Sequence, residues 1–387
     1  MKKSKLQFAF VTLALLLTNC NRPLENCTIT GRVIGRSSSS LILINALERP
    51  DPHRAIANIP IKDSIFTFEL DANPVQAYWL IFEDDYTSRK GLFPITIFPD
   101  KEEIKLELYD SKLIAQNKIY GGKLNNQFAS FREKSKSKYD PLLNALYEKL
   151  NDLGENVSIE TAREINKQLD SIYKEKYSWN YNYYDQNKTL VSYYLLLDEL
   201  SNGYNTGYNE NYSDLSKIKY LINSISAKYP DHPYNNFSTD LIAGYDKVKV
   251  GGEFVDFTLP DLNGDNVTMS QSIEGKIALI DFWASWCGPC IVNSRSMIPV
   301  YNEFKDSGFT IIGVAGEIDN TNQLIKTLER EKFPWINLVE LNKQNGIWTK
   351  YGIPNDAGCT FLVDKDGTIL AVSPTAEEVR KILIQKF

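Results

Sequence analysis

Two cysteines, Cys287 and Cys290, stand two residues apart in the sequence Trp-Cys-Gly-Pro-Cys. They follow the apolar run 277–282, an order that predicts a buried strand, a tight turn and the first turn of a helix. A thiol at a helix N-terminus is stabilised as the thiolate by the helix dipole and by free backbone N–H groups. A second thiol nearby can attack the mixed disulfide that the first one forms. The spacing therefore predicts thiol–disulfide exchange.

Composition limits the other kinds of chemistry. With 387 residues, 43% of them hydrophobic and 24% charged, the chain is expected to fold into several soluble domains. Its net charge of -6 argues against a nucleic-acid partner. Two histidines, His53 and His232, are too few for a His-based metal site or a Ser-His-Asp triad. Other roles of the cysteine pair fit less well. A zinc site needs about four ligands, and haem attachment needs a His where Ile291 stands. A purely structural disulfide between residues this close would constrain very little of the chain.

The N-terminus predicts export. Residues 1–5 are basic, and residues 8–17 form an apolar run too short for the roughly 20 residues of a membrane span. Leu-Thr-Asn-Cys, ending at Cys20, resembles a bacterial lipobox, although Asn19 replaces the usual small residue. The resemblance implies a signal peptide over 1–19 and a lipid on Cys20. The alternative is an ordinary signal peptide with a chance cysteine. No acidic export tag follows, so we expect a periplasmic protein; whether the inner or outer membrane holds it stays open.

The region 20–122 is expected to be rich in strands. Short alternating or continuously apolar segments that predict strands are found at 28–35, 41–44, 65–70, 78–82 and 104–108. Short strands at this spacing favour an antiparallel sandwich or a barrel. No residue pattern in this region has catalytic spacing, so we interpret it as a binding or spacing module.

The residue pattern changes at about residue 123, and the region 123–247 is expected to be helical. Helical periodicity is found at 142–153, 158–177, 190–200 and 215–229. The aromatic run 179–184 is placed at a joint between helices. We expect its tyrosines to pack with their hydroxyl groups in water. Lining a groove for a partner is the alternative.

The region 248–387 predicts an alternation of strands and helices. A hairpin turn at Asn263-Gly264 comes first. Thr375 and Glu378 have capping-box spacing and begin the last helix. The expected strands are 277–282, 309–314, 335–339, 360–364 and 368–372, with helices after the cysteine turn and at 320–331.

This order, with the cysteine pair after the first core strand, resembles the thioredoxin fold. The leading hairpin and the helix–strand insertion at 318–340 resemble the membrane-anchored TlpA/ResA-like thiol–disulfide oxidoreductases, over residues 248–387 only. The strand-rich region resembles the small β domain that precedes such modules in Bacteroidetes lipoproteins. We therefore expect a multi-domain α+β protein: an N-terminal β sandwich or barrel, a helical middle domain and a C-terminal α/β thioredoxin fold.

The resemblance implies roles for four side chains. Cys287 attacks the substrate and Cys290 resolves the mixed disulfide. Asp281 matches a buried Asp that relays a proton to or from the resolving cysteine, and burial is expected to raise its pKa. Glu317 resembles an active-site Glu of ResA-like proteins that tunes the cysteine pKa values. A solvated loop carboxylate is an equally good interpretation of Glu317.

Four further residues are expected to contact substrate. Trp286 shields the cysteines and offers an apolar platform, and Pro289 restrains the loop between the thiols. Gly358 stands where the family carries a cis-proline, and because a cis bond before a non-proline residue costs about 2.5–4 kcal/mol, we expect a trans or rearranged loop. Pro354 is too far away to replace it. Cys359 is either a small buried strand residue, an alternative disulfide partner or a third metal ligand.

The predicted function is a lipid-anchored envelope thiol–disulfide oxidoreductase. It would reduce or exchange disulfides in extracytoplasmic proteins and draw electrons from a membrane donor, with no cofactor except the redox-active disulfide Cys287–Cys290 and no metal. Two alternatives stay open. One is a partner- or ligand-binding lipoprotein with a vestigial redox site. The other is a thiol peroxidase, which the lack of a Thr-x-x-Cys pattern disfavours.

Overall fold

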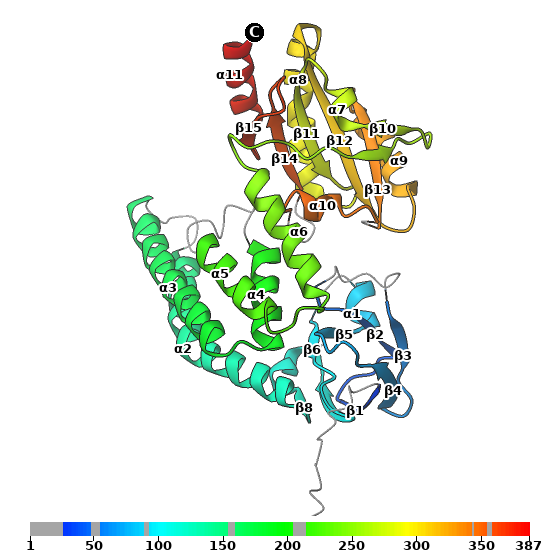
Figure 1. Cartoon of the computed structure of the whole chain (residues 1–387), viewed down its shortest axis with the longest axis vertical. Coiled ribbons are helices and arrows are strands. Elements are labelled where there is room, and N and C mark those ends of the chain that lie inside the picture. The colour runs from blue at the N-terminus through cyan, green and yellow to red at the C-terminus, as the bar shows by residue number, and fades with distance from the viewer. Residues whose placement is uncertain are drawn as a thin grey trace, which may run out of the picture.

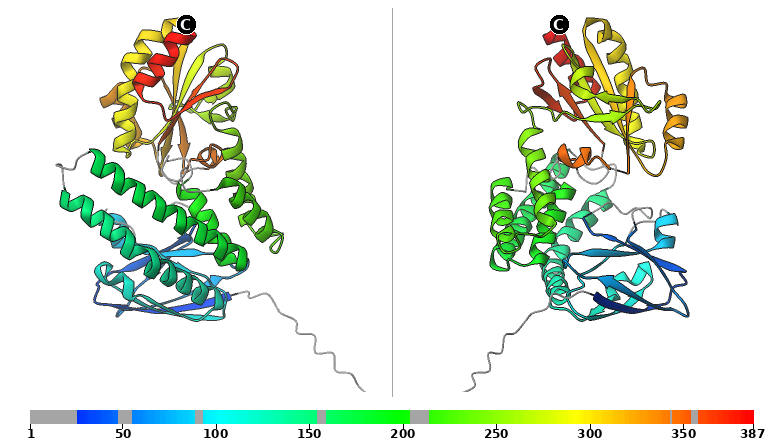
Figure 2. Two further views of the ribbon diagram at one scale, coloured as in Figure 1. Left: turned by 90° about the vertical axis from the view of Figure 1, so that its left-hand side faces the viewer. Right: turned by 45° about the vertical axis from the view of Figure 1, so that its right-hand side comes forward.

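The structure is a computed structural model that describes residues 26–47, 55–88, 93–153, 159–203, 214–342, 344–353 and 358–387. The mixed α/β region occupies one end of the long axis, and the β region and the helical region lie side by side toward the other end (Figure 1; Figure 2). The predicted signal segment 1–19 and Cys20 lie outside the described residues. Among the described helices, none has the length and apolarity needed to cross a bilayer.

Two four-stranded sheets form the β region, with orders β4-β1-β7-β8 and β3-β2-β5-β6. Apolar side chains from both sheets, such as Ile29 and Leu80, share one buried cluster, as in a sandwich. The expectation of purely antiparallel pairing is wrong, because β1 and β7 run parallel. The elements are β1 Asn26–Ile34, β2 Ser40–Asn45, β3 Ala57–Pro60, β4 Ile65–Asp71, β5 Tyr78–Phe82, α1 Glu83–Ser88, β6 Ile95–Ile97, β7 Glu103–Tyr109, the 3-10 turn Ser111–Gln116 and β8 Lys118–Tyr120.

The helical region is built from α2 Lys123–Leu153, α3 Ile159–Gln186, α4 Leu190–Gly203, α5 Leu215–Ser226 and α6 Tyr234–Lys247. Helix α2 begins well before the predicted segment and carries Pro141 within it. Helix α3 continues through the aromatic run 179–184. The prediction that this run connects two helices is therefore wrong. Tyr181 and Tyr184 are buried in the core of this region. Their burial supplies the tertiary packing that stabilises the helix across this segment, whose Trp, Asn and Tyr residues are weaker helix formers. The Tyr181 hydroxyl is buried, so the expectation that the tyrosine hydroxyl groups lie in water is wrong for this residue.

The β and helical regions share a core. Ala77 and Phe98 from the β region belong to the same apolar cluster as α4, α5 and α6. Two tyrosine hydroxyl groups also cross the boundary. Tyr234 Oη accepts a hydrogen bond from the Ala77 backbone N–H at 2.8 Å, and Tyr194 Oη accepts one from Trp79 Nε1 at 3.1 Å. The helices therefore pack directly on the sandwich.

The C-terminal region is a five-stranded sheet of order β13-β12-β11-β14-β15. Strands β11, β12 and β13 are parallel, and β14 and β15 are antiparallel to their neighbours. A separate apolar cluster covers each face of the sheet. The elements are β9 Thr258–Pro260, β10 Asn266–Thr268, α7 Met269–Ser272, β11 Ile277–Trp283, α8 Gly288–Phe304, the 3-10 turn Lys305–Ser307, β12 Phe309–Glu317, α9 Asn322–Glu331, β13 Ile336–Leu341, α10 Ile347–Lys350, β14 Cys359–Val363, β15 Ile369–Val372 and α11 Ala376–Lys386.

Helix α6 packs against the short helix α10 (Figure 1). The approach is close at Gly244, where an added Cβ would lie 2.9 Å from both the Gly352 nitrogen and the Lys350 oxygen. Gly358, a few residues further along the chain, lies against Cys290. The helical region therefore contacts the chain segment that leads to the cysteine end of the sheet.

Candidate active site

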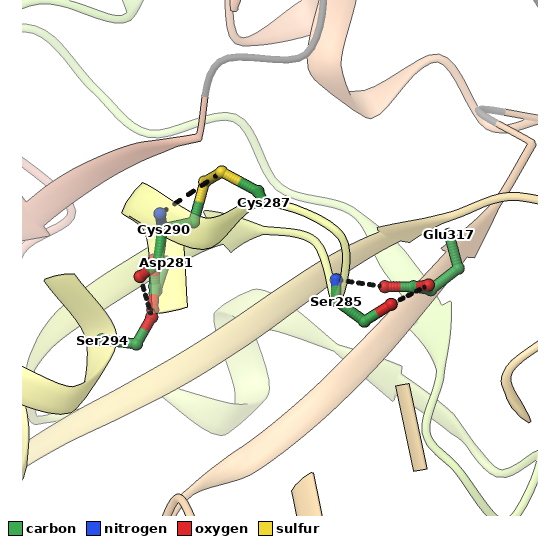
Figure 3. The surroundings of a disulfide bond; sticks show 6 residues. All are labelled: Asp281, Ser285, Cys287, Cys290, Ser294 and Glu317. Atoms are coloured by element: carbon green, nitrogen blue, oxygen red, sulfur yellow. Dashed lines mark hydrogen bonds between the residues drawn. A yellow bond between two sulfur atoms is a disulfide. The ribbon is translucent and has the colours of Figure 1, made fainter. Parts of the chain in front are cut away.

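The strand β11 and the helix α8 position the two cysteines. Every residue of β11 is buried, so the strand is held on both faces. After a short turn, Cys287 forms the N-cap of α8, and its Sγ accepts a hydrogen bond from the Cys290 backbone N–H at 3.3 Å. The two sulfur atoms are joined in a disulfide (Figure 3). The pair therefore lies at the positive end of the helix dipole, which favours a thiolate on Cys287 once the bond is reduced.

The two sulfur-bearing residues differ in exposure. Cys287 is half-buried, whereas Cys290 is 9% exposed and packs in the core beneath α8. Trp286 is 39% exposed beside Cys287, and Pro289 is exposed in the first turn of α8. A substrate sulfur can thus reach Cys287 more readily than Cys290.

Asp281 lies on the same face of β11 as the residues that pack against Cys290. It is 2% exposed, and burial raises its pKa to about 7. Ser294 Oγ donates a hydrogen bond to Asp281 Oδ2 at 2.6 Å, which opposes part of that increase (Figure 3). The same hydroxyl oxygen is 3.0 Å from the Cys290 carbonyl oxygen. Asp281 can therefore bind or release a proton near neutral pH.

Sequence reasoning missed Ser294. It follows Cys290 by four residues, so the two lie on the same face of α8. A hydroxyl at that spacing from the second cysteine was the available signal.

Glu317 is buried at the end of β12, so its interpretation as a solvated loop carboxylate is wrong. Its two carboxylate oxygens accept hydrogen bonds from the backbone N–H and the Oγ of Ser285, both at 2.7 Å (Figure 3). Ser285 belongs to the turn before Cys287 and was also missed from the sequence. The arrangement ties that turn to the central sheet.

Gly358 lies in direct contact with the resolving cysteine. A Cβ added at Gly358 would be 2.4 Å from Cys290 Sγ and 2.7 Å from the Phe282 oxygen. The absence of a side chain therefore lets this backbone approach the disulfide. The expected rearrangement of the loop, and Pro354 within it, lie outside the described residues.

Cys359 is not brought to the cysteine pair. In the sheet, Thr360 opposes Asp281, and neighbouring residues on a strand point to opposite faces. Cys359 accordingly packs with Phe361 in the cluster on the other face, where its Sγ is 3.3 Å from Ser373 Oγ. Burial raises its thiol pKa to about 11. This geometry supports the small buried strand residue and does not support a third ligand or an alternative disulfide.

Residues 250–372 match the AhpC/TSA family. The thiol-disulfide oxidoreductase ResA of Bacillus thuringiensis (strain Al Hakam) is 30% identical over 131 residues, which cover 33% of this chain and 71% of that protein. The C-terminal third of the chain belongs to the ResA-like thiol–disulfide oxidoreductases.

Two further likenesses fall on the same ResA-like region. ResA of Halalkalibacterium halodurans is 28% identical over 141 residues, covering 36% of this chain and 74% of that protein. The crystal structure of the thioredoxin domain of a thiol-disulfide oxidoreductase from Bacteroides vulgatus covers 36% of this chain and 99% of its own, with 26% identity and a TM-score of 0.34. The β and helical regions precede all of the matched residues of the family.

Proposed function

We propose that the ResA-like domain reduces or exchanges disulfides in extracytoplasmic proteins through Cys287 and Cys290. One observation carries the proposal: a half-buried thiol at a helix N-terminus is paired with a buried thiol whose helix also contacts a buried Asp281. An attacking thiol needs access and a low pKa, whereas a resolving thiol needs only its neighbour and a place to send its proton.

The reaction balances without a bound cofactor. In the dithiol form, the Cys287 thiolate attacks one sulfur of a substrate disulfide and releases the other sulfur as a thiolate. The Cys290 thiol then loses its proton, and its thiolate attacks Cys287 Sγ. The Cys287–Cys290 disulfide forms, and the second substrate thiolate leaves. Two electrons have passed to the substrate, and a dithiol donor returns two electrons to the pair.

Asp281 is proposed to take the proton from Cys290 in the second step. Its raised pKa, about 7, lets the carboxyl both accept and release a proton at neutral pH. A carboxyl with an ordinary pKa near 4 would be a much weaker base for a thiol. Glu317 is proposed to act on the same site by holding the turn that carries Ser285.

The test is to trap the mixed disulfide. In Cys290→Ser, the second step is blocked, so substrate proteins are expected to stay linked to Cys287 on non-reducing gels. The matched control is Cys287→Ser, which keeps the inner thiol and should trap far less. If Cys290→Ser traps no protein and the wild-type dithiol pair stays reduced with every disulfide substrate tried, the proposal is wrong. Hydrogen peroxide consumption without mixed disulfides would favour a thiol peroxidase instead.

We further propose that Cys20 carries a lipid that tethers the protein on the periplasmic side of the cell envelope. The apolar run and lipobox-like sequence before Cys20 support this location. Cys20→Ser is expected to leave the protein in the membrane fraction only weakly or not at all, with disulfide exchange unchanged. If Cys20→Ser stayed fully in the membrane fraction after salt and carbonate washes, the lipid tether would be contradicted.

A further inference from the structure

Helix α6 runs directly into the ResA-like domain. Its C-cap residue, Val248, is buried in the same apolar cluster as Phe282 of β11. The Val248 backbone N–H donates a hydrogen bond to the Gly244 oxygen at 2.8 Å, which continues the last turn of the helix. Tyr245, in the same turn, donates a hydrogen bond from its Oη to the Leu200 oxygen of α4 at 2.6 Å. The end of α6 is therefore fixed to both the helical region and the ResA-like domain.

Gly244 is buried where α6 meets α10, and the space there does not admit a side chain. A Cβ added at Gly244 would lie 2.9 Å from the Lys350 oxygen and the Gly352 nitrogen, and 3.0 Å from the Thr349 oxygen. All three are backbone atoms, which cannot turn away as the end of a flexible side chain can. Glycine inside a helix costs roughly 0.5–1 kcal/mol relative to alanine, so the close packing is the feature that favours glycine here.

Helix α10 contacts β11 as well as α6. The rings of Trp348 and of Tyr351, the C-cap residue of α10, contact the Phe282 ring with centroid distances of 4.9 and 4.7 Å. Tyr351 Oη donates a hydrogen bond to the Val255 oxygen at 2.6 Å. Trp348 also fills the space over Gly316, where an added Cβ would be 2.9 Å from the indole ring. These contacts leave α10 little room to move without moving Phe282.

Phe282 belongs to the surroundings of the resolving cysteine. A Cβ added at Gly358 would lie 2.7 Å from the Phe282 oxygen and 2.4 Å from Cys290 Sγ, so both atoms pack against this glycine. Phe282 also pairs with Cys359 in the sheet, which holds the start of β14 beside it. Packed residues of α10, Phe282 and Gly358 thus join Gly244 to Cys290 Sγ. Such a series transmits a displacement, because protein interiors are close-packed.

We propose that Gly244 is a positioning residue for the cysteine pair, and that the helical region thereby tunes the redox potential of Cys287–Cys290. The inference rests on the exchange reaction proposed above. Its direction follows from the freedom of the sulfur atom. In the disulfide, Cys290 Sγ is held by its bond to Cys287, whereas a free thiol can turn about its Cα–Cβ bond. Pressure of Gly358 on this sulfur therefore raises the free energy of the disulfide more than that of the dithiol.

The experiment is a redox titration of the full chain against glutathione, read by thiol alkylation and the mass of the peptide that carries both cysteines. Two glutathione thiols reduce the pair and are oxidised to one glutathione disulfide. In Gly244→Ala, the added methyl group displaces α10 toward Phe282. We expect the Cys287–Cys290 disulfide to become easier to reduce by about threefold in the equilibrium constant, which corresponds to ~14 mV.

The matched control is Ala243→Ser, which adds one heavy atom at the exposed neighbouring position of α6 and should leave the potential unchanged. A wild-type pair that does not exchange with glutathione would refute the proposed function itself. Normal exchange in wild type, with the same potential in folded Gly244→Ala, overturns only the positioning role.

Trp348→Phe tests the route and decides the case in which Gly244→Ala does not fold. It shortens the ring that contacts Phe282, so the pressure on Gly358 falls and the disulfide should become harder to reduce by about twofold, the lower range for an aromatic contact. In the double variant, the effect of Gly244→Ala should be smaller than in wild type, because residues that share contacts are not additive. Circular dichroism verifies folding. Lower stability with an unchanged potential in every folded variant would mean that α6 and α10 only hold the two regions together, and would overturn the proposal.

Discussion

Asp281 and Glu199 are carboxyl groups with raised pKa values in two different regions of the molecule. Burial is the main cause in both, with values of about 7 for Asp281 and about 8 for Glu199. Their surroundings differ. Asp281 receives a 2.6 Å hydrogen bond from Ser294 and lies in the layer that holds Cys290. Glu199 is hydrogen-bonded to the side chains of Tyr181, Asn180 and Tyr184, and the charge of Asp198 raises its pKa further.

The difference shows that burial alone does not assign a role. Removing a carboxyl from water raises its pKa wherever it occurs. A proton-transfer role needs a second titrating group nearby, and for Asp281 we propose the thiol of Cys290, which lies on the same helix as Ser294. Glu199 lies instead in the wall of a cavity in the helical region, among tyrosine side chains. The predictions that follow test this contrast, from the largest expected effect to the smallest.

The largest expected effect concerns stability. Asp281 binds its proton more tightly in the folded protein than in the unfolded chain, so the free energy of unfolding falls as pH rises from about 4 to about 7. Above about pH 7 the carboxylate is ionised in the folded protein, and the full cost of burying its charge lowers the free energy of unfolding. Compared with wild type, Asp281→Asn should gain up to about 4 kcal/mol between pH ~4 and pH ~8, at roughly 1.4 kcal/mol per pKa unit. Urea unfolding across this range measures the gain.

Glu199→Gln is the matched variant for that measurement. Relative to wild type, its free energy of unfolding should also increase with pH. The increase should continue to about pH 8, because the raised pKa of Glu199 lies there. Identical pH profiles for the two variants, or a loss of stability at high pH in either, would contradict the contrast between the two groups.

The second prediction concerns the rate of exchange. Asp281→Asn cannot accept the proton of Cys290, so attack on the mixed disulfide should slow roughly 100-fold at neutral pH, the lower range for general-base catalysis. Stopped-flow release of a fluorescent substrate thiol measures this step. Glu199→Gln is the control and should leave the rate unchanged. An equal loss in both variants would indicate a general structural effect and not proton transfer.

The third prediction concerns Gly358. A Cβ there would be 2.4 Å from Cys290 Sγ, so Gly358→Ala must displace the loop or the cysteine. We expect the disulfide to become easier to reduce, with about a tenfold change in the glutathione equilibrium, or ~30 mV. Redox titration followed by thiol alkylation gives the value, and Gly358→Pro repeats the test with the family's usual residue. A potential unchanged in both variants would show that the close approach has no influence on the pair.

The smallest expected effect belongs to Ser294. Its hydrogen bond lowers the pKa of Asp281, so Ser294→Ala should raise that pKa further and move the pH profile of the resolving step upward. At neutral pH the rate should fall by about fivefold, the factor that corresponds to a hydrogen bond of ~1 kcal/mol. Ser296→Ala is the control on the same helix, because Ser296 is exposed and bonds only the Asn293 carbonyl. A rate loss without any shift of the pH profile would contradict the positioning role.

Local sequence signals were enough for several elements. The apolar run 277–282 predicted the strand β11, and Cys287 at the N-cap of α8 follows from the turn that comes after it. Thr375 and Glu378 form the predicted capping box of α11. The strand β5 has the predicted bounds, Tyr78–Phe82. In each of these cases, neighbours in the sequence supply the interactions that define the element.

Other features depend on contacts between distant residues, which the sequence does not display. The pairing of β1 with β7 joins residues about 75 positions apart, and alternation alone does not reveal whether such strands run parallel. Helix α3 extends through residues 179–184 because Phe131 of α2 packs against the rings of this segment. Ser285 and Ser294 acquired roles only when Glu317 and Asp281 came within hydrogen-bond distance.

The cysteine spacing and the strand before it predicted thiol–disulfide chemistry, because a helix dipole and a neighbouring thiol act over a few residues. The tertiary structure supplied the surroundings of each buried acid. The sequence already indicated a buried Asp281, whereas it gave no signal for Glu199. Only folding places the Ser294 hydroxyl beside Asp281 and Glu199 in the wall of a cavity. Such neighbours depend on packing in three dimensions, so the residue pattern along the chain does not express them.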